Sequence, residues 1–235
     1  EYNDILVSAC AAEEIAAFTG DGTNPAVMEG ATKAIKAAEG RGIPTVKPWD
    51  VNTLAEKFAL VKEAGAFACA MDVDAAGLPF LKNLTPPAGS KSTEELKRII
   101  DDAGLPFILK GIMTVNFSVK AKEAGAAAIV VSNHGGRVLD QCPPTAEVLP
   151  EIADAVGRDM KILVDGGIRS GVDVFKALAL GADAVLIGRP YVTAVYGGAA
   201  EGVKALTDKL AAELEDTMAM CGAHSLEEIT RDMVR

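Results

Sequence analysis

Residues suited to proton transfer and to carboxylate binding lie close together in the stretch VVSNHGGRVLDQ, residues 130–141. His134 follows a hydrophobic run and stands three residues before Arg137. An imidazole can take a proton from an α-hydroxy acid near neutral pH, and a guanidinium can bind the carboxylate of such an acid through two hydrogen bonds. Gly135 and Gly136 allow the backbone to bend between them. The stretch therefore indicates acid–base chemistry on a small carboxylate.

Two glycine-rich turns suit an anion. DGGIR, residues 165–169, and GRP, residues 188–190, each follow a short apolar run. Glycine lets backbone amides approach an anion, and the loops after the last two strands of an α/β barrel commonly bind phosphate. We therefore expect a phosphate group at these turns, although sugar-phosphate barrels use the same pattern.

A lysine ends another apolar run. Lys110 follows Pro-Phe-Ile-Leu, where a charged side chain is costly unless it points out of the core toward a partner. We expect it to face a ligand. His224, the second histidine of the chain, has no comparable neighbours and is interpreted as a turn residue.

The elements that position these residues repeat along the chain. Segments beginning at Val61, Ala121 and Ala177 each contain a helical stretch, a glycine, Ala-x-Ala and a short apolar run. Other apolar runs follow Gly42, Gly104 and Arg158, and one lies in EEIAAFTGDG, residues 13–22. These runs are seven candidate strands that alternate with helices, which favours a parallel sheet covered by helices.

Polar residues follow nearly every candidate strand, which distinguishes a barrel from an open sheet. They are Thr19, Lys47, Asp72, Asp74, Lys110, Ser132 to His134, Asp165 and Arg189. A (βα)8 TIM barrel presents such residues around one mouth, whereas an open sheet concentrates them at one switch point. We predict a single barrel domain over residues 1–235 that has seven of eight strands. Because the chain starts at Glu1 without a methionine, we expect the missing strand–helix unit to be the first one.

Three helix starts have the spacing of a capping box. Thr53 with Glu56, Ser92 with Glu95, and Ser225 with Glu228 each predict a helix whose first free amides are capped by side chains.

Composition excludes several classes of protein. A net charge of −10 disfavours nucleic acid as a partner, because such binding depends on clustered Lys and Arg. Four cysteines without CxxC spacing predict reduced thiols, no metal site and a cytoplasmic location. The apolar stretches are interrupted well before the ~20 residues of a membrane helix.

Four motifs in order carry a specific resemblance. They are AMDVDAAG (70–77), LKG (109–111), SNHGGR (132–137) and the segment from Asp165 to Pro190. From about Ile15 to its end, the chain resembles the FMN-dependent α-hydroxy-acid oxidases and dehydrogenases, such as glycolate and lactate oxidases. The resemblance implies a flavoprotein oxidoreductase that oxidises a small 2-hydroxy acid to the 2-oxo acid.

The resemblance also implies roles for single residues. His134 would be the catalytic base, Asp74 would orient it, and Arg137 would bind the substrate carboxylate. Lys110 would lie beside the flavin edge that gains negative charge on reduction. The remaining FMN contacts would come from Thr19, Lys47, Asp72, Asp165, Gly166, Gly167, Arg169, Gly188 and Arg189.

The chain departs from the family pattern around the substrate. Lys47 stands where relatives usually have a glutamine, and Asp72 where they usually have a threonine. Trp49 takes the place of a substrate-binding tyrosine. A second arginine is expected after Asp74, but the nearest cation there is Lys82.

Two alternatives stay open. One is a flavin-independent barrel enzyme that acts on a phosphorylated metabolite through the same glycine-rich turns. The other is an inactive truncated fragment. Unpaired strand edges in a seven-stranded barrel also predict association between copies of the chain, a homo-oligomer.

Overall fold

The computed structural model describes residues 1–84 and 88–234. Seven strands form one sheet in which each strand pairs in parallel with the next along the chain. They are β1 (Ala17–Thr19), β2 (Gly42–Val46), β3 (Cys69–Asp72), β4 (Phe107–Ile112), β5 (Ala128–Val131), β6 (Lys161–Val164) and β7 (Ala184–Val185). A doubly wound sheet reverses its strand order at a switch point, whereas this order runs in sequence. The prediction of a seven-stranded barrel-type sheet is therefore confirmed.

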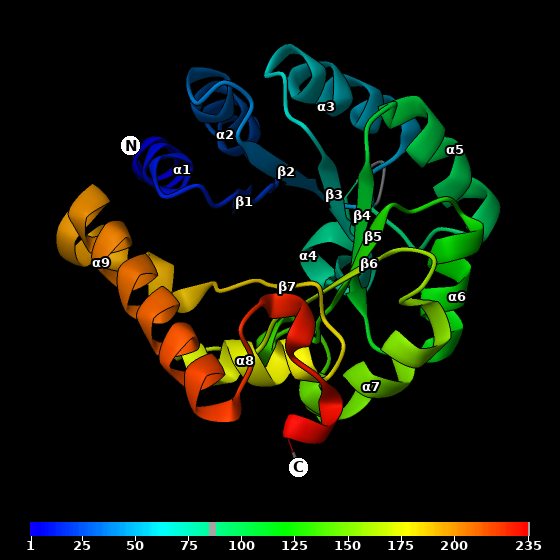
Figure 1. Cartoon of the computed structure of the whole chain (residues 1–235). Coiled ribbons are helices and arrows are strands. Elements are labelled where there is room, and N and C mark those ends of the chain that lie inside the picture. The colour runs from blue at the N-terminus through cyan, green and yellow to red at the C-terminus, as the bar shows by residue number, and fades with distance from the viewer. Residues whose placement is uncertain (85–87, 235) are drawn as a thin grey trace.

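Helices surround the curled sheet (Figure 1). They are α1 (Tyr2–Ala12), α2 (Pro25–Ala37), α3 (Val51–Glu63), α4 (Pro79–Lys82), α5 (Thr93–Ala103), α6 (Val115–Glu123), α7 (Thr145–Val156), α8 (Gly171–Ala179) and α9 (Arg189–Cys221). Short 3₁₀ turns span Val73–Gly77, His134–Gly136, Leu226–Glu228 and Arg231–Met233. α9 bends at Gly198 and Ala199, which are not helical. α9 packs against both α1 and α8, so the first and last α-helices of the chain lie side by side.

Successive residues of the strands alternate between the inside of the curled sheet and the helical layer, except at the carboxyl end of β4, where the register shifts. On β3 and β4, Ala70 and Ile108 belong to a small inner cluster, while Met71 and Leu109 pack with the helices in the main core. On β5 the inner residues are Ala128 and Val130. Both faces are apolar because each face is covered, as parallel sheets require. This alternation decides which polar residues at the strand ends face inward.

Only one of the three predicted capping boxes is present among the described residues. Ser92 and Glu95 cap α5 reciprocally. The prediction for Thr53 is wrong: the cap is Asp50, three residues earlier, and α3 begins at Val51. The prediction for Ser225 is also wrong, since a three-residue 3₁₀ turn follows it without a side-chain cap. Asp50 is the N-cap in place of Thr53, because its carboxylate accepts hydrogen bonds from two backbone N–H groups at once.

In the described part of the chain, no helix has both the length and the apolar character needed to cross a bilayer.

Candidate active site

The carboxyl ends of five neighbouring strands carry polar side chains on the inward row. Each of these residues comes two positions after an inward-facing residue of its strand, so period-two alternation turns all of them to the same side. They are Lys47, Asp72, Lys110, Ser132 and Asp165. Asp72 and Lys110 are also directly paired in register on β3 and β4. The strand geometry therefore collects these charges at one mouth of the sheet.

Asp72 lies between two ammonium groups. Its Oδ2 atom is 2.6 Å from Lys47 Nζ, and its Oδ1 atom is 3.4 Å from Lys110 Nζ. Lys110 Nζ lies 3.5 Å from Asp165 Oδ2 as well and donates to the hydroxyl of Ser132. Ser132 in turn donates to Asp165. The result is a nearly buried chain of alternating charges that runs from β2 to β6.

For Asp72 and Lys110, the neighbouring charges and burial change the pKa in opposite directions. Burial works to raise the pKa of Asp72, but Lys110 and Lys47 outweigh it and hold that pKa below its ordinary value. For Lys110, burial works to lower the pKa, and the carboxylates of Asp72, Asp165 and Asp74 outweigh it, so the pKa is raised. Asp72 and Lys110 therefore stay charged at neutral pH.

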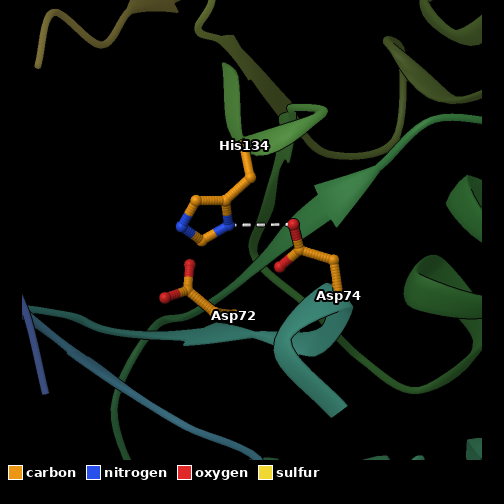
Figure 2. Close-up of side chains that lie close together, drawn as sticks. All are labelled: Asp72, Asp74 and His134. Atoms are coloured by element: carbon orange, nitrogen blue, oxygen red, sulfur yellow. Dashed lines mark hydrogen bonds and ion pairs between the residues drawn. The ribbon is translucent and has the colours of Figure 1, made fainter. Parts of the chain in front are cut away.

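His134 and Asp74 form a hydrogen-bonded pair at the same mouth (Figure 2). The Nδ1 atom of His134 lies 2.9 Å from Asp74 Oδ2. Because a carboxylate can only accept, we assign the hydrogen to Nδ1, which leaves Nε2 able to accept a proton. Ser132 holds the backbone of the histidine by accepting from the His134 N–H group. The pair has the geometry of a base oriented by a carboxylate.

A bulge in β4 makes room for this pair. The register of β4 shifts between Lys110 and Ile112, and Gly111 has a φ of +99° there. A Cβ atom on Gly111 would lie only 2.6 Å from Cγ of Asp74. Sequence reasoning treated Gly111 only as part of the LKG motif, because its close neighbour is far away along the chain.

A cavity of about 310 Å³ opens beside His134. Besides His134, the described residues around it include four cations and the two glycine-rich turns. The cations are Lys110, Arg137, Arg169 and Arg189. Gly166 and Gly167 both have positive φ, which turns the backbone in a way that other residues rarely adopt. Such a wall suits an anionic ligand.

The residues present fit a phosphate-bearing cofactor with a polar ring system. The cavity combines the turn at Gly166 and Gly167 with arginine side chains, as a phosphate site requires. In addition, one oxygen of Asp165, which lines the cavity, is buried without a hydrogen-bond partner in the described structure. The same is true of the Thr19 hydroxyl and of one oxygen of Asp74, neither of which is among the described residues around the cavity. Buried polar atoms of this kind are normally satisfied by a ligand or by water.

Trp49 lies apart from the cavity wall. Its side chain is buried, its Nε1 atom donates to Asp21 Oδ2 at 2.6 Å, and the ammonium of Lys57 lies 5.4 Å from the ring centre. The structure thus gives Trp49 a contact within the protein, and its substrate-binding role stays a prediction. Lys82 is exposed at the end of α4 and is not among the described residues around the cavity.

Asp21 was missed by sequence reasoning. Its fully buried carboxylate accepts from Lys57 Nζ at 2.7 Å, from Gly22 N and Trp49 Nε1, and from Lys47 N at 3.3 Å. These donors come from the loops after β1 and β2 and from α3. Apart from the adjacent Gly22, these donors lie 26 to 36 residues away from Asp21 along the chain, so nothing near Asp21 in the sequence points to them.

Asp72, Asp74 and His134 also place three ligand-type atoms within 4.8 Å of one another. Lys47 and Lys110 already neutralise Asp72 at this point, and their positive charges oppose a cation. The geometry favours ion pairs over a metal centre, and the absence of a metal stays a prediction.

Comparison with known proteins agrees with a site for a phosphate-bearing cofactor. Residues 76–235 match the family described as FMN-dependent dehydrogenase. A peroxisomal (S)-2-hydroxyacid oxidase of Arabidopsis thaliana is 48% identical over 145 residues, which cover 62% of this chain and 39% of that protein. An L-lactate oxidase of a Roseobacter species is 43% identical over 143 residues, with 61% and 39% covered. The match thus spans about two fifths of the length of these relatives.

Solved structures show the same fold. A mandelate oxidase superimposes with a TM-score of 0.85 at 31% identity, covering 97% of this chain and 72% of that one. A mandelate oxidase variant solved with an FMN adduct gives a TM-score of 0.84 at 32% identity, with the same shares covered. The family match covers more than half of the chain and includes the histidine, the lysine and both glycine-rich turns. The chain therefore belongs to the FMN-dependent dehydrogenase family.

Proposed function

We propose that this protein is an FMN-dependent oxidoreductase that oxidises a small 2-hydroxy acid, similar to lactate or glycolate, to the 2-oxo acid. The observation that carries the proposal is the His134–Asp74 pair at 2.9 Å, placed beside a cavity with a cationic wall. A base and a carboxylate-binding group beside one cavity are what oxidation of a hydroxy acid requires.

The residues around the cavity would have different roles in cofactor binding, according to their chemistry. Gly166, Gly167, Arg169, Gly188 and Arg189 would hold the phosphate of FMN, since they combine backbone amides with guanidinium groups. FMN, when bound, supplies the acceptor for the two electrons of the substrate. Lys110 places a positive charge on the wall of the cavity.

His134 and Arg137 act on the substrate itself. Arg137, which is exposed at the cavity, binds the carboxylate of the hydroxy acid. His134 Nε2 accepts a proton from the hydroxy acid. The positive charge that then forms on the imidazole ring is stabilised by Asp74. Asp74 also fixes the orientation of the ring.

The proposal is tested with His134→Ala in the FMN-loaded protein. Flavin binding should persist, while anaerobic reduction of the flavin by lactate or glycolate should slow by about 10²- to 10⁴-fold, the usual contribution of a positioned base. His224→Ala is the matched control, because it removes the other histidine, which is exposed and far along the chain. Unchanged reduction in His134→Ala would contradict the assignment, and a protein that never binds FMN would favour the phosphorylated-metabolite alternative.

We also propose that copies of the chain associate and that the protein works in the cytoplasm. In the described structure β1 and β7 each pair on one side only, and unpaired edges promote association. The four cysteines, all within the described residues, form no disulfide there, which suits a reducing compartment. Light scattering of the purified protein and fractionation of the source cells test the two proposals.

A further inference from the structure

We propose that Lys47 and Asp72 form a charge-compensating pair that sets the electron affinity of the FMN site. The pair would act by balancing the positive charge of Lys110 on the wall of the cavity. This inference rests on the proposed function, because it needs FMN in that cavity.

The position of Asp72 makes it a shared partner. It ends β3 between Lys47 on one neighbouring strand and Lys110 on the other, with ammonium groups 2.6 Å and 3.4 Å from its two oxygens. The side chains of Lys47, Asp72 and Lys110 are 12%, 9% and 13% exposed. Charges so nearly buried are weakly screened by water and salt. Lys110 lines the cavity, so Asp72 acts on the cavity from beside Lys110, and Lys47 acts from beside Asp72.

The inward chain of charges is balanced as it stands. Lys47 and Lys110 contribute two positive charges, and Asp72 and Asp165 contribute two negative charges. Removing the charge of Asp72 alone leaves an excess positive charge, and removing the charge of Lys47 alone leaves an excess negative charge. Removing both restores the balance.

Lys47 is held from both ends, unlike a mobile surface lysine. Its Nζ atom bonds Asp72, while its backbone N–H donates to the buried carboxylate of Asp21. Asp21 also accepts from the indole of Trp49, two residues further on. The loop after β2 is therefore fixed with the ammonium group turned inward.

The sign of the effect follows from the charge that FMN acquires. Reduction places negative charge on the flavin ring, so a neighbouring positive charge favours the reduced form and a negative charge disfavours it. Asp72→Asn should therefore raise the midpoint potential of bound FMN, and Lys47→Gln should lower it. The double variant Lys47→Gln/Asp72→Asn should return close to the potential of the parent.

The experiment measures the midpoint potential of FMN bound to the parent, both single variants and the double variant. We expect each single substitution to change the equilibrium constant of the two-electron reduction about tenfold, which corresponds to about 30 mV, in opposite directions. Lys47→Arg keeps the charge and should leave the potential near the parent value. Lys36→Gln and Glu63→Gln form the matched control, because Lys36 and Glu63 make an exposed pair at 2.9 Å and should shift nothing.

Flavin-free protein gives a second readout. In urea unfolding, the double variant should lose less stability than the sum of the two single variants, since each single variant leaves one buried charge without its partner. Because this measurement needs no FMN, it still reports on the pair if one single variant binds the cofactor poorly.

The two proposals fail in different ways. A parent protein that does not bind FMN contradicts the proposed function and, with it, the role of this pair. If FMN binds but the single variants shift the potential in the same direction, or the double variant does not return toward the parent, only the charge-compensation inference is overturned.

Discussion

At the scale of single residues, the position of Asp74 depends on a neighbour that has no side chain. Gly111 lies against Asp74 from the bulge of β4, and its φ of +99° is a conformation that other residues rarely adopt. The bulge thus affects the positions of both Lys110 and Asp74. It ends the inward row at Lys110 and leaves space for the carboxylate that orients His134.

Gly111→Ala should therefore separate Asp74 from His134. The added Cβ would come within 2.6 Å of Asp74 Cγ, so the carboxylate has to move. We expect flavin reduction by the hydroxy acid to slow by about 10-fold or more while FMN remains bound, because a displaced orienting group mainly affects the chemical step. Gly125→Ala is the control: its φ of +89° imposes similar strain, but its Cβ would meet nothing within 4 Å. Equal losses in both variants would show that backbone strain alone is responsible.

The lowered pKa of Asp72 predicts how stability depends on acid. Its ordinary pKa is 3.8, and the folded value lies below that, so the stabilisation is present above 3.8 and is lost as pH falls through the folded value. The difference in unfolding free energy between the parent and Asp72→Asn should shrink as the pH falls from about 6 to about 2. Urea unfolding across that range measures it. A difference that stays constant over the same range would mean that Asp72 is not held ionised by its lysines.

At the scale of elements, the loops after β1 and β2 are joined through one buried carboxylate. Asp21 collects donors from both loops and from Lys57 on α3. These loops carry no regular structure of their own, so the hydrogen bonds to Asp21 give them a defined shape. Because Lys47 leaves the second loop toward Asp72, the same anchor supports the cavity.

Asp21→Asn should destabilise the fold substantially. It leaves the Lys57 ammonium, which is 11% exposed, without a counter-charge, and breaking such a pair costs about 3–5 kcal/mol. Asp159→Asn removes one partner of an exposed pair with Lys122 and should cost at most about 1 kcal/mol. Thermal and urea unfolding compare the two variants. A cost for Asp21→Asn as small as that of the exposed control would contradict its role as an anchor.

At the scale of the whole molecule, sequence reasoning predicted what depends on local patterns. Apolar runs that end in polar residues predicted the seven strands and the residues at their carboxyl ends. This worked because buried parallel strands need continuous apolar content. Alternation then predicts that Asp72 shares a face with Ala70 and that Lys110 shares a face with Ile108, but only the structure shows that this face is the inner one. The bond from Trp49 to Asp21 and the space left by Gly111 were not predictable, since each depends on contacts between distant segments. The cap of α3 was misread because Asp50 and Thr53 both suit that position.

The last helix is tied to the rest of the molecule by a close backbone contact. Gly171 begins α8, and a Cβ there would overlap the backbone of Glu213 and Leu214 on α9. The Gly171 N–H also donates to Glu213 Oε2 at 2.8 Å. Because α9 packs against both α8 and α1, this contact helps to close the ring of helices (Figure 1).

Gly171→Ala should therefore push α9 outward and destabilise the whole molecule by about 1–3 kcal/mol, the usual cost of overpacking. FMN affinity should fall as well, because α8 directly follows the turn at Gly166 and Gly167 that lines the cavity. Gly30→Ala in α2 is the control: its Cβ would meet nothing within 4 Å, and alanine at a helical position should raise stability by up to about 1 kcal/mol. Urea unfolding and titration with FMN measure both effects. If Gly171→Ala were as stable as the parent, α9 would have to shift freely over α8, and the ring of helices would not constrain the turn at Gly166 and Gly167.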